Sequence, residues 1–394
     1  MKKTLIALAA LGAMAGAHAQ STVTLYGLLD GNIQSFKTNI LVPATATTAA
    51  TIQSARQTKI ESGGLNGSRW GMRVSEDIGG GMAIVGNLES GLNLDTGASG
   101  QGGLLFGRRA NAGISSSSFG TLVIGRNSSS YDDVSADHAM MGASIFDPSN
   151  TNNGNDTTKA AAISNVSATV PQAASVVSAA GAVNFLNRNT SWVGFNTRFN
   201  NSVKYSTPNF SGFSGSAMYA FGEDKVPGVK ASESVSANLK YANGPILVSG
   251  GYQSEAIGRT ASTKPALENA LLNMAYDFGV AKVGLGFNRA KYKDVAAPAS
   301  LGGGNIAPQK EVSLSVAVPL GATTLSAGVA RSKGDTLGKS TGFGVQALYS
   351  LSKRSTLYAG AQSTKGYDKL INSLPAGSSA SKITTYGLGL RHTF

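Results

Sequence analysis

The chain has 394 residues, with 50 glycines, no cysteine, 14% charged residues and a formal net charge of +12. The absence of cysteine excludes thiolate catalysis and cysteine-based metal sites, and the charged fraction is well below the roughly 25% of an ordinary soluble domain. The basic residues are scattered, without a basic helix or interleaved aromatics, which disfavours nucleic-acid binding and leaves anionic lipid or an anion pathway.

The first 20 residues have the three regions of a secretory signal. Lys2 and Lys3 form the charged region, and the apolar run over residues 5–17 is too short to cross a bilayer as a helix. The sequence AHA at residues 17–19 supplies the small residues of a cleavage site. We therefore expect a signal peptide at residues 1–19 and an exported mature chain that begins at residue 20.

From residue 22 onward, apolar and polar residues alternate with the period of a β-strand. In SRWGMRVSED, residues 68–77, Trp70, Met72 and Val74 share one face, and Arg69 and Arg73 share the other. An arginine at the midplane of a bilayer costs about 2–4 kcal/mol, so a membrane barrel would turn both arginines toward its interior. A soluble sandwich also alternates, so alternation alone does not decide between the two.

The number and spacing of the connections favour a membrane barrel. Seven tight turns, rich in glycine, proline, asparagine, aspartate and serine, separate eight longer connections. The longer connections lie at about 36–66, 93–104, 128–197, 222–232, 254–266, 292–309, 332–340 and 365–381. We predict an all-β, 16-stranded antiparallel transmembrane β-barrel over residues 20–394, with short periplasmic turns and long extracellular loops.

A barrel of 16 strands leaves an aqueous channel, whereas eight strands give a filled interior. Many positions expected to face the interior carry small residues, and we expect water to fill the space beside them. They are Gly284, Gly286, Ser313, Ser326, Gly328, Gly344, Gly387 and Gly389.

Several stretches resemble the general diffusion porins of β-proteobacteria, of the Neisseria, Bordetella and Burkholderia type. They are SGGLNGSRWGMRVSEDIGGGMAIVGNLESGLNLDTG, LFGRRANAGISSSSFGTLVIGRN, VTLYGLLDGNIQ, NNSVKYSTPNFSGF, YSLSKRSTLYAG and GLGLRHTF. The resemblance implies a homotrimer, a third loop folded into the pore, and passive diffusion of small hydrophilic solutes and ions. It also implies outer-membrane lipid, lipopolysaccharide and the outer-membrane assembly machinery as partners. The chain departs from the family at Asn111 and Ala112 and in a third loop of about 70 residues.

The resemblance also implies a narrow waist, where basic residues on the wall face acidic residues on the third loop. The basic candidates are Arg69, Arg73, Arg109, Arg198 and Lys204. The acidic candidates are Asp132, Asp133, Asp137 and Asp147 in the loop, with Glu89 on the inner face of the third strand. The cations exceed the acids that we assign with confidence, which predicts a modest anion preference. The alternatives are that the cations lie near a rim, solvated or bound to lipopolysaccharide phosphate, and that the carboxylates are ordinary loop residues.

Catalytic and cofactor motifs are missing from the sequence, so we predict a protein that is not an enzyme and has no cofactor or metal. After removal of the signal, only His138 and His392 remain, and no histidine pair has zinc-ligand spacing. The runner-up to a general porin is a substrate-selective channel, with a binding site formed by the long third loop.

The chain ends on YGLGLRHTF, which reads as a strand rather than a frayed tail. Tyr386, Leu388 and Leu390 should face lipid, and Arg391 should face the interior. An open sheet edge in a membrane leaves backbone groups unsatisfied, so this strand should pair with the first one. In the family that the chain resembles, a C-terminal aromatic such as Phe394 is the outer-membrane assembly signal.

Overall fold

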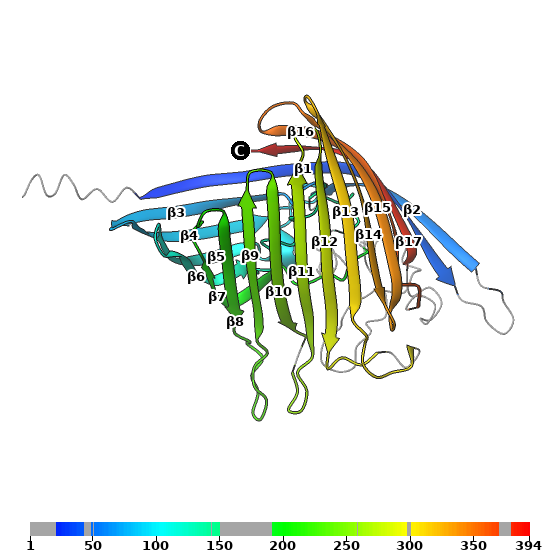
Figure 1. Ribbon diagram of the computed structural model, residues 1–394, viewed down its shortest axis with the longest axis horizontal. Coiled ribbons are helices and arrows are strands. Elements are labelled where there is room, and N and C mark those ends of the chain that lie inside the picture. The colour runs from blue at the N-terminus through cyan, green and yellow to red at the C-terminus, as the bar shows by residue number, and fades with distance from the viewer. Residues whose placement is uncertain are drawn as a thin grey trace, which may run out of the picture.

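Each strand pairs with its neighbours along the chain, so the strands form one antiparallel sheet that curves round on itself (Figure 1). The computed structural model describes residues 21–42, 49, 51–142, 144–149, 191–257, 259–297, 301–369 and 380–394. The predicted signal peptide and residues 160–183, the part of the third loop that is rich in alanine, serine and valine, lie outside these ranges. Among the described residues, no helix is long and apolar enough to cross a membrane.

The described residues form 17 strand segments and one short helical turn, α2 (Gly100–Gly103), which follows β4. The segments are β1 (Thr22–Val42), β2 (Thr51–Ser62), β3 (Arg69–Gly79), β4 (Met82–Gly91), β5 (Arg109–Ser116), β6 (Gly120–Ser128), β7 (Arg198–Ser206), β8 (Phe213–Ala220), β9 (Ser234–Asn243), β10 (Ile246–Ala256), β11 (Ala266–Asp277), β12 (Lys282–Lys293), β13 (Gln309–Leu320), β14 (Thr323–Gly334), β15 (Gly338–Ser350), β16 (Ser355–Lys365) and β17 (Ala380–Thr393).

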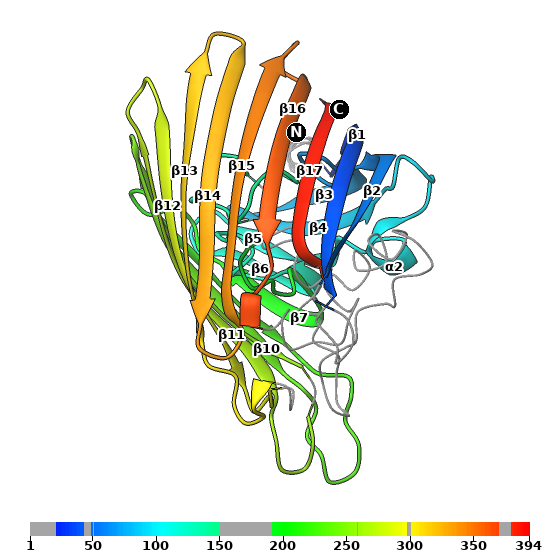
Figure 2. The ribbon, with the colours of Figure 1, turned by 90° about the vertical axis from the view of Figure 1, so that its right-hand side faces the viewer.

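Pairing of the last strand with the first closes the sheet. The ladder between β1 and β17 runs from Leu28 opposite Thr393 toward the far end of both strands, and Figure 2 shows the two strands side by side. The backbone N–H of Phe394 donates to the Gly27 carbonyl at 3.0 Å, and the N–H of Gly27 donates back at 3.1 Å. The closure predicted from the C-terminal sequence is confirmed, and it satisfies backbone groups that an open edge would expose to lipid.

The 17 segments make 16 strand positions because β2 and β3 share one place beside β1. β3 pairs with the first part of β1, from Thr22 to Leu28, and β2 pairs with the rest, from Gly31 to Val42. The predicted 16-stranded barrel is therefore confirmed. The loop expected at residues 36–66 is wrong, because β1 and β2 continue there as a paired hairpin. The connection expected at 332–340 is reduced to a turn at residues 335–337.

The break between β2 and β3 is built around a buried carboxylate. Asp30 accepts hydrogen bonds from the backbone N–H groups of Gly64, Leu65 and Asn66 at 2.7–3.1 Å. The hydroxyl of Tyr358, on β16, donates to the same carboxylate. Asp30 thus satisfies three backbone donors at the point where the chain leaves the ladder.

The two faces of the sheet have opposite character, as the alternation predicted. On β13, the side chains of Val312 and Leu314 are 43% and 49% exposed on the outer face, whereas Glu311 and Ser313 are buried on the inner face. The same contrast recurs on β3 and β17, where Val74, Leu388 and Leu390 are exposed. An apolar outside and a polar inside are the pattern of a barrel that lipid surrounds.

Candidate pore constriction

The third loop, residues 129–197, lies against the inner wall wherever it is described. Ser130 and Tyr131 contact β9 and β12 soon after the loop begins, and Asp147 contacts β16 near the end of the first described part. Wall residues that hydrogen-bond to this first part of the loop include Ser236, Asn273, Asn288, Ser315 and Gln362. The loop therefore follows the inner face of the sheet from β9 to β16.

Glycines on the inner wall leave the space that the third loop occupies. A Cβ on Gly360 would lie 2.6 Å from the ring of Phe146, and one on Gly286 would lie 2.6 Å from the imidazole of His138. On Gly344, a Cβ would overlap the carbonyl oxygen of Phe146. The expectation that water fills the space beside these small residues is wrong here, because the loop packs directly on them. Sequence reasoning identified Gly286 and Gly344 as interior positions, but not Gly360, and it could not identify what covers them.

The return part of the third loop, residues 191–197, is held by two buried carboxylates on the wall. The N–H of Val193 donates to Glu311 Oε1 at 2.7 Å, and the N–H of Asn196 donates to Glu255 Oε2 at 2.6 Å. Both glutamates are at most 2% exposed. Neither was among the predicted site residues, because nothing in the sequence near them indicates a distant backbone partner.

On the opposite part of the wall, β3 carries cations toward the interior. Arg69 and Arg73 pair across the sheet with Leu28 and Thr24, on the same face as Tyr26. The guanidinium of Arg73 lies 4.1 Å from the centre of the Tyr26 ring, a cation–π contact. The orientation predicted for both arginines from alternation is confirmed.

Glu89 lies among these cations on the inner face of β4, beside Asn87, as the alternation predicted. Its Oε1 accepts from Arg108 Nε at 2.6 Å, and its Oε2 accepts from the Tyr26 hydroxyl at 2.8 Å. Arg109, on β5, pairs directly across from Glu89. Arg108 was not predicted, because it precedes β5 and the alternation of that strand does not constrain it. Its position beside Arg109 in the sequence was the only available signal.

Arg198 begins β7 and lies within electrostatic range of both Asp132 and Arg108. Its Nη1 donates to the Thr197 hydroxyl at 3.0 Å. The regular alternation expected from Arg198 to Lys204 is interrupted, because Asn201 has a φ of +48° and the pairing of β6 with β7 shifts register after Gly125. A bulge of this kind changes which residues share a face, and sequence periodicity cannot locate it.

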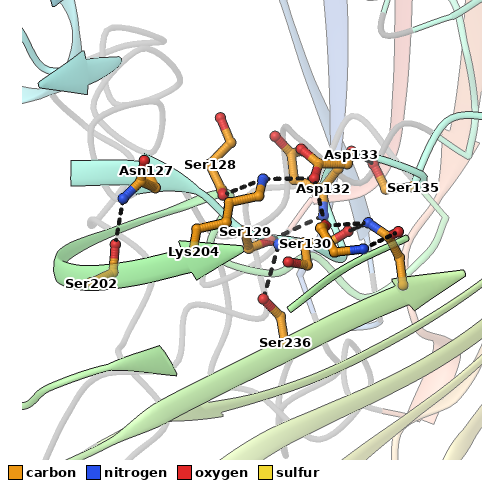
Figure 3. A network of polar contacts seen from close by, with 12 residues as sticks. Asn127, Ser128, Ser129, Ser130, Asp132, Asp133, Ser135, Ser202, Lys204 and Ser236 are labelled. Carbon is orange, nitrogen blue, oxygen red and sulfur yellow. Dashed lines mark hydrogen bonds and ion pairs between the residues drawn. The ribbon is translucent and has the colours of Figure 1, made fainter. Parts of the chain in front are cut away.

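Two loop carboxylates form ion pairs with lysines on the wall. Lys204 Nζ lies 2.6 Å from Asp133 Oδ2 and also donates to the Ser128 carbonyl at 3.0 Å (Figure 3). Farther along the loop, Asp137 Oδ1 lies 2.9 Å from Lys240 Nζ. The structure thus brings together one basic wall candidate, Lys204, and one acidic loop candidate, Asp133. Lys240, on β9, is a partner that the sequence did not indicate.

The other two loop carboxylates differ from each other in their surroundings. Asp132 has a pKa raised to about 6 because burial disfavours its charge, although Arg198 opposes the shift. Burial also raises the pKa of Asp147 to about 6, against hydrogen bonds from the Ser149 N–H and hydroxyl. Among the described residues, Asp147 has no cation within ion-pair distance. Its position is beside the loop anchor Phe146.

His138, a residue of the third loop, packs against the inner wall as a neutral side chain. Its ring stacks on Trp192 with 5.0 Å between ring centres, and burial lowers its pKa to about 4. Its Nε2 is 3.1 Å from the Ser149 hydroxyl. Within the part of the chain that the structure describes, no cluster of histidine and carboxylate residues is placed to hold a metal ion.

These placements make the inner wall from β3 to β7 strongly basic. The cations are Arg69, Arg73, Arg108, Arg109, Arg198 and Lys204, and the carboxylates near them are Glu89, Asp132 and Asp133. A polar passage lined by an excess of one charge concentrates ions of the opposite charge.

Residues 7–369 match the sequence model of the family described as Gram-negative porin. The chain belongs to this family. An outer membrane porin protein of Bordetella pertussis is 32% identical over 307 residues, which cover 73% of this chain and 69% of the relative. Outer membrane porin protein 32 of Delftia acidovorans is 28% identical over 302 residues, which cover 74% of this chain and 71% of the relative. The protein is therefore an outer-membrane porin, a channel for passive diffusion.

Solved structures agree on the fold of this porin. The anion-selective porin from Comamonas acidovorans superposes with a TM-score of 0.67 at 23% identity, over 95% of this chain and all of the other. A loop-deletion variant of the Vibrio cholerae outer membrane protein OmpT superposes with a TM-score of 0.58 at 17% identity, over 95% and 99% of the two chains. At these identities, the likeness concerns the barrel fold.

Proposed function

We infer that this porin conducts small hydrophilic solutes and ions with a modest preference for anions, without any catalysed step. The observation that carries this proposal is the excess of six cations over three carboxylates on the inner wall between β3 and β7. The basic candidates predicted from the sequence, with Arg108 added, supply the attraction for anions. Asp132 and Asp133 limit it from the third loop. The anion selectivity of the Comamonas acidovorans porin, which has the same fold, supports the proposal.

The direct test is the conductance of the purified porin in a planar lipid bilayer under a salt gradient. We expect stable conductance steps and a reversal potential of the sign that anion preference produces. A reversal potential of the opposite sign would reject the anion preference and leave the porin assignment intact. Flux that saturates with one class of solute would favour a substrate-selective channel instead.

We also propose that the porin functions as a homotrimer, as the family resemblance implies. One similar structure, Vibrio cholerae OmpT, is described in a trimer form. Native mass spectrometry of protein extracted in mild detergent tests this, and a mass of one chain would contradict it.

Phe394 is proposed as a signal for outer-membrane assembly, and its place in the barrel supports a role at the closing seam. Its ring lies so close to Gly27 that a Cβ there would overlap it, and its backbone pairs with the same residue. Deleting Phe394 should lower the amount of folded porin in the outer membrane more than it changes single-channel conductance. Normal surface levels of the deletion variant would contradict this role.

A further inference from the structure

A short segment between β2 and β3 is held from both sides of the closing seam. Gly64, Leu65 and Asn66, which we call the 64–66 segment, donate their backbone N–H groups to the carboxylate of Asp30 on β1. Arg391 lies directly opposite Asp30 on β17 (Figure 2), and its Nη1 donates to the Asn66 side-chain oxygen at 2.7 Å. The 64–66 segment is therefore bound where the first and last strands meet.

The side chain of Tyr358, on β16, adds a fourth donor to the same carboxylate. Its hydroxyl donates to Asp30, and the residue is only 4% exposed. Two glycines leave the space for it, because a Cβ on either Gly64 or Gly389 would overlap the phenol group. An ionised carboxylate accepts hydrogen bonds with both oxygens and donates none, so it suits a place where four donors converge.

The third loop contacts the 64–66 segment at residues 145 and 146. The N–H of Ile145 donates to the Gly64 carbonyl at 2.8 Å. Leu65, Phe146 and Tyr358 form one buried apolar cluster. Within it, the rings of Phe146 and Tyr358 meet edge to face, with 6.3 Å between their centres. The β1 carboxylate therefore acts on the loop through this segment and through the tyrosine ring.

These contacts fix the far end of the first described part of the loop. The near end is bound at Ser130 and Tyr131, which contact β9 and β12. Because the loop lies inside the barrel, its position between the two ends sets the width of the passage. Without the carboxylate of Asp30, the N–H groups of the 64–66 segment would lose their acceptor, which is unfavourable for buried donors. The segment would then rearrange, and the loop would lose its support.

We propose that Asp30 is a positioning residue of this channel, which sets the width of the passage by holding the 64–66 segment against the third loop. The proposal rests on the channel function and is independent of the anion preference. A purely structural role for Asp30 has a different consequence. Loss of the carboxylate would then lower the yield of folded porin and leave the conductance of each folded channel unchanged.

The test is Asp30→Asn in the full-length porin, measured as single-channel conductance in a planar lipid bilayer. The asparagine amide replaces one acceptor oxygen by a donor, so part of the four donors lose their acceptor. We expect conductance steps about 1.5-fold larger than those of the wild type, because the loop then covers less of the passage. Steps of unchanged size would overturn the proposal.

Ser68→Ala is the matched control, because Ser68 is buried at the same junction but bonds to the backbone of Asp30 instead of its carboxylate. Its hydroxyl donates to the Asp30 carbonyl at 3.0 Å and accepts from the Asp30 N–H at 2.9 Å. The variant should destabilise the same junction and keep the conductance of the wild type. Enlarged steps in Ser68→Ala would mean that any loosening of the junction widens the passage, which would overturn the specific role of the carboxylate.

A double variant tests whether Asp30 acts through the loop. Phe146→Ala alone releases the same contact, so Asp30→Asn added to it should change the step size by less than about 10%. An additional increase as large as that of Asp30→Asn alone would show that Asp30 acts by another route, and it would overturn the proposal.

Leu65→Ala decides the question if Asp30→Asn does not assemble. This variant leaves Asp30 and its four donors in place and removes the side chain that packs against Phe146. We expect steps about 1.5-fold larger than those of the wild type, and unchanged steps would overturn the proposal. Ion selectivity is measured separately as a reversal potential, so a failure of the anion preference would leave these step sizes unaffected.

Discussion

The cations inside the barrel and those on its outer face differ in what surrounds them. Inside, Lys204 and Arg108 lie 2.6 Å from carboxylates, and Arg73 lies over an aromatic ring. Outside, Lys310 and Lys333 face each other across the sheet, with no carboxylate in ion-pair range among the described residues. Partly neutralised cations beside water can pass anions along, whereas the outer cations lie beside apolar side chains that face lipid. Net charge alone therefore does not reveal how a basic residue is used.

The largest effect is expected from a substitution that loosens the third loop. This loop supplies Asp132 and Asp133, two of the three carboxylates near the inner cations. Phe146 is fully buried against Gly360 and Tyr358. Phe146→Ala should lower the free energy of unfolding by about 3–5 kcal/mol and enlarge the conductance steps as the loop loosens. Phe343→Ala is the control, because it removes the same ring from the outer face. Equal conductance of Phe146→Ala and wild type would show that the loop is held elsewhere.

The second effect concerns ion selectivity. The triple variant Arg73→Gln, Arg109→Gln and Arg198→Gln should lower the anion-to-cation permeability ratio by about tenfold, because it removes half of the cations on the inner wall. A variant of the outer face, Lys310→Gln, Lys333→Gln and Lys339→Gln, loses the same charge and should leave the ratio unchanged. Reversal potentials in a salt gradient measure both. A similar change of the permeability ratio in both variants would show that inner and outer cations affect selectivity equally.

A smaller effect is expected at a single ion pair. Asp133→Asn removes the carboxylate partner of Lys204, so the permeability ratio should shift toward anions by about twofold. Asp335→Asn, at the exposed turn between β14 and β15, is the control. A shift toward cations, measured in the same bilayer experiment, would contradict a constriction role for Asp133.

The smallest effect is a dependence on pH. The pKa values of Asp132 and Asp147 are raised to about 6 by burial, so both carboxyls gain protons and lose negative charge as the pH falls from about 7 to 5. Anion preference should therefore increase over this interval, by less than about twofold. Asp132→Asn should weaken the dependence. A decrease of anion preference on acidification would contradict the expectation.

The barrel was predictable because its signals are local. Alternation over ten residues assigned Trp70 outward and Arg73 inward, and turn residues at regular spacing gave the strand number. The constriction was predictable only in part. Arg198 lies beyond a bulge that shifts the pattern, and Arg108 precedes the strand whose alternation would have placed it. Lys240 and Glu255 have partners about 60 to 100 residues away in the chain, and no local pattern encodes them.

The amino-acid sequence alone specifies the barrel, its two faces and its closing strand, because alternation and turn chemistry act between residues that are near neighbours in the chain. Three further features required the folded chain: Phe146 covers inner glycines, Asp133 meets Lys204, and basic residues of four strands form one outer row. Each of these depends on strand register, which brings together residues far apart in the chain. The sequence identifies the basic residues. It does not identify the residues that surround them in the fold, and these determine the function of each cation.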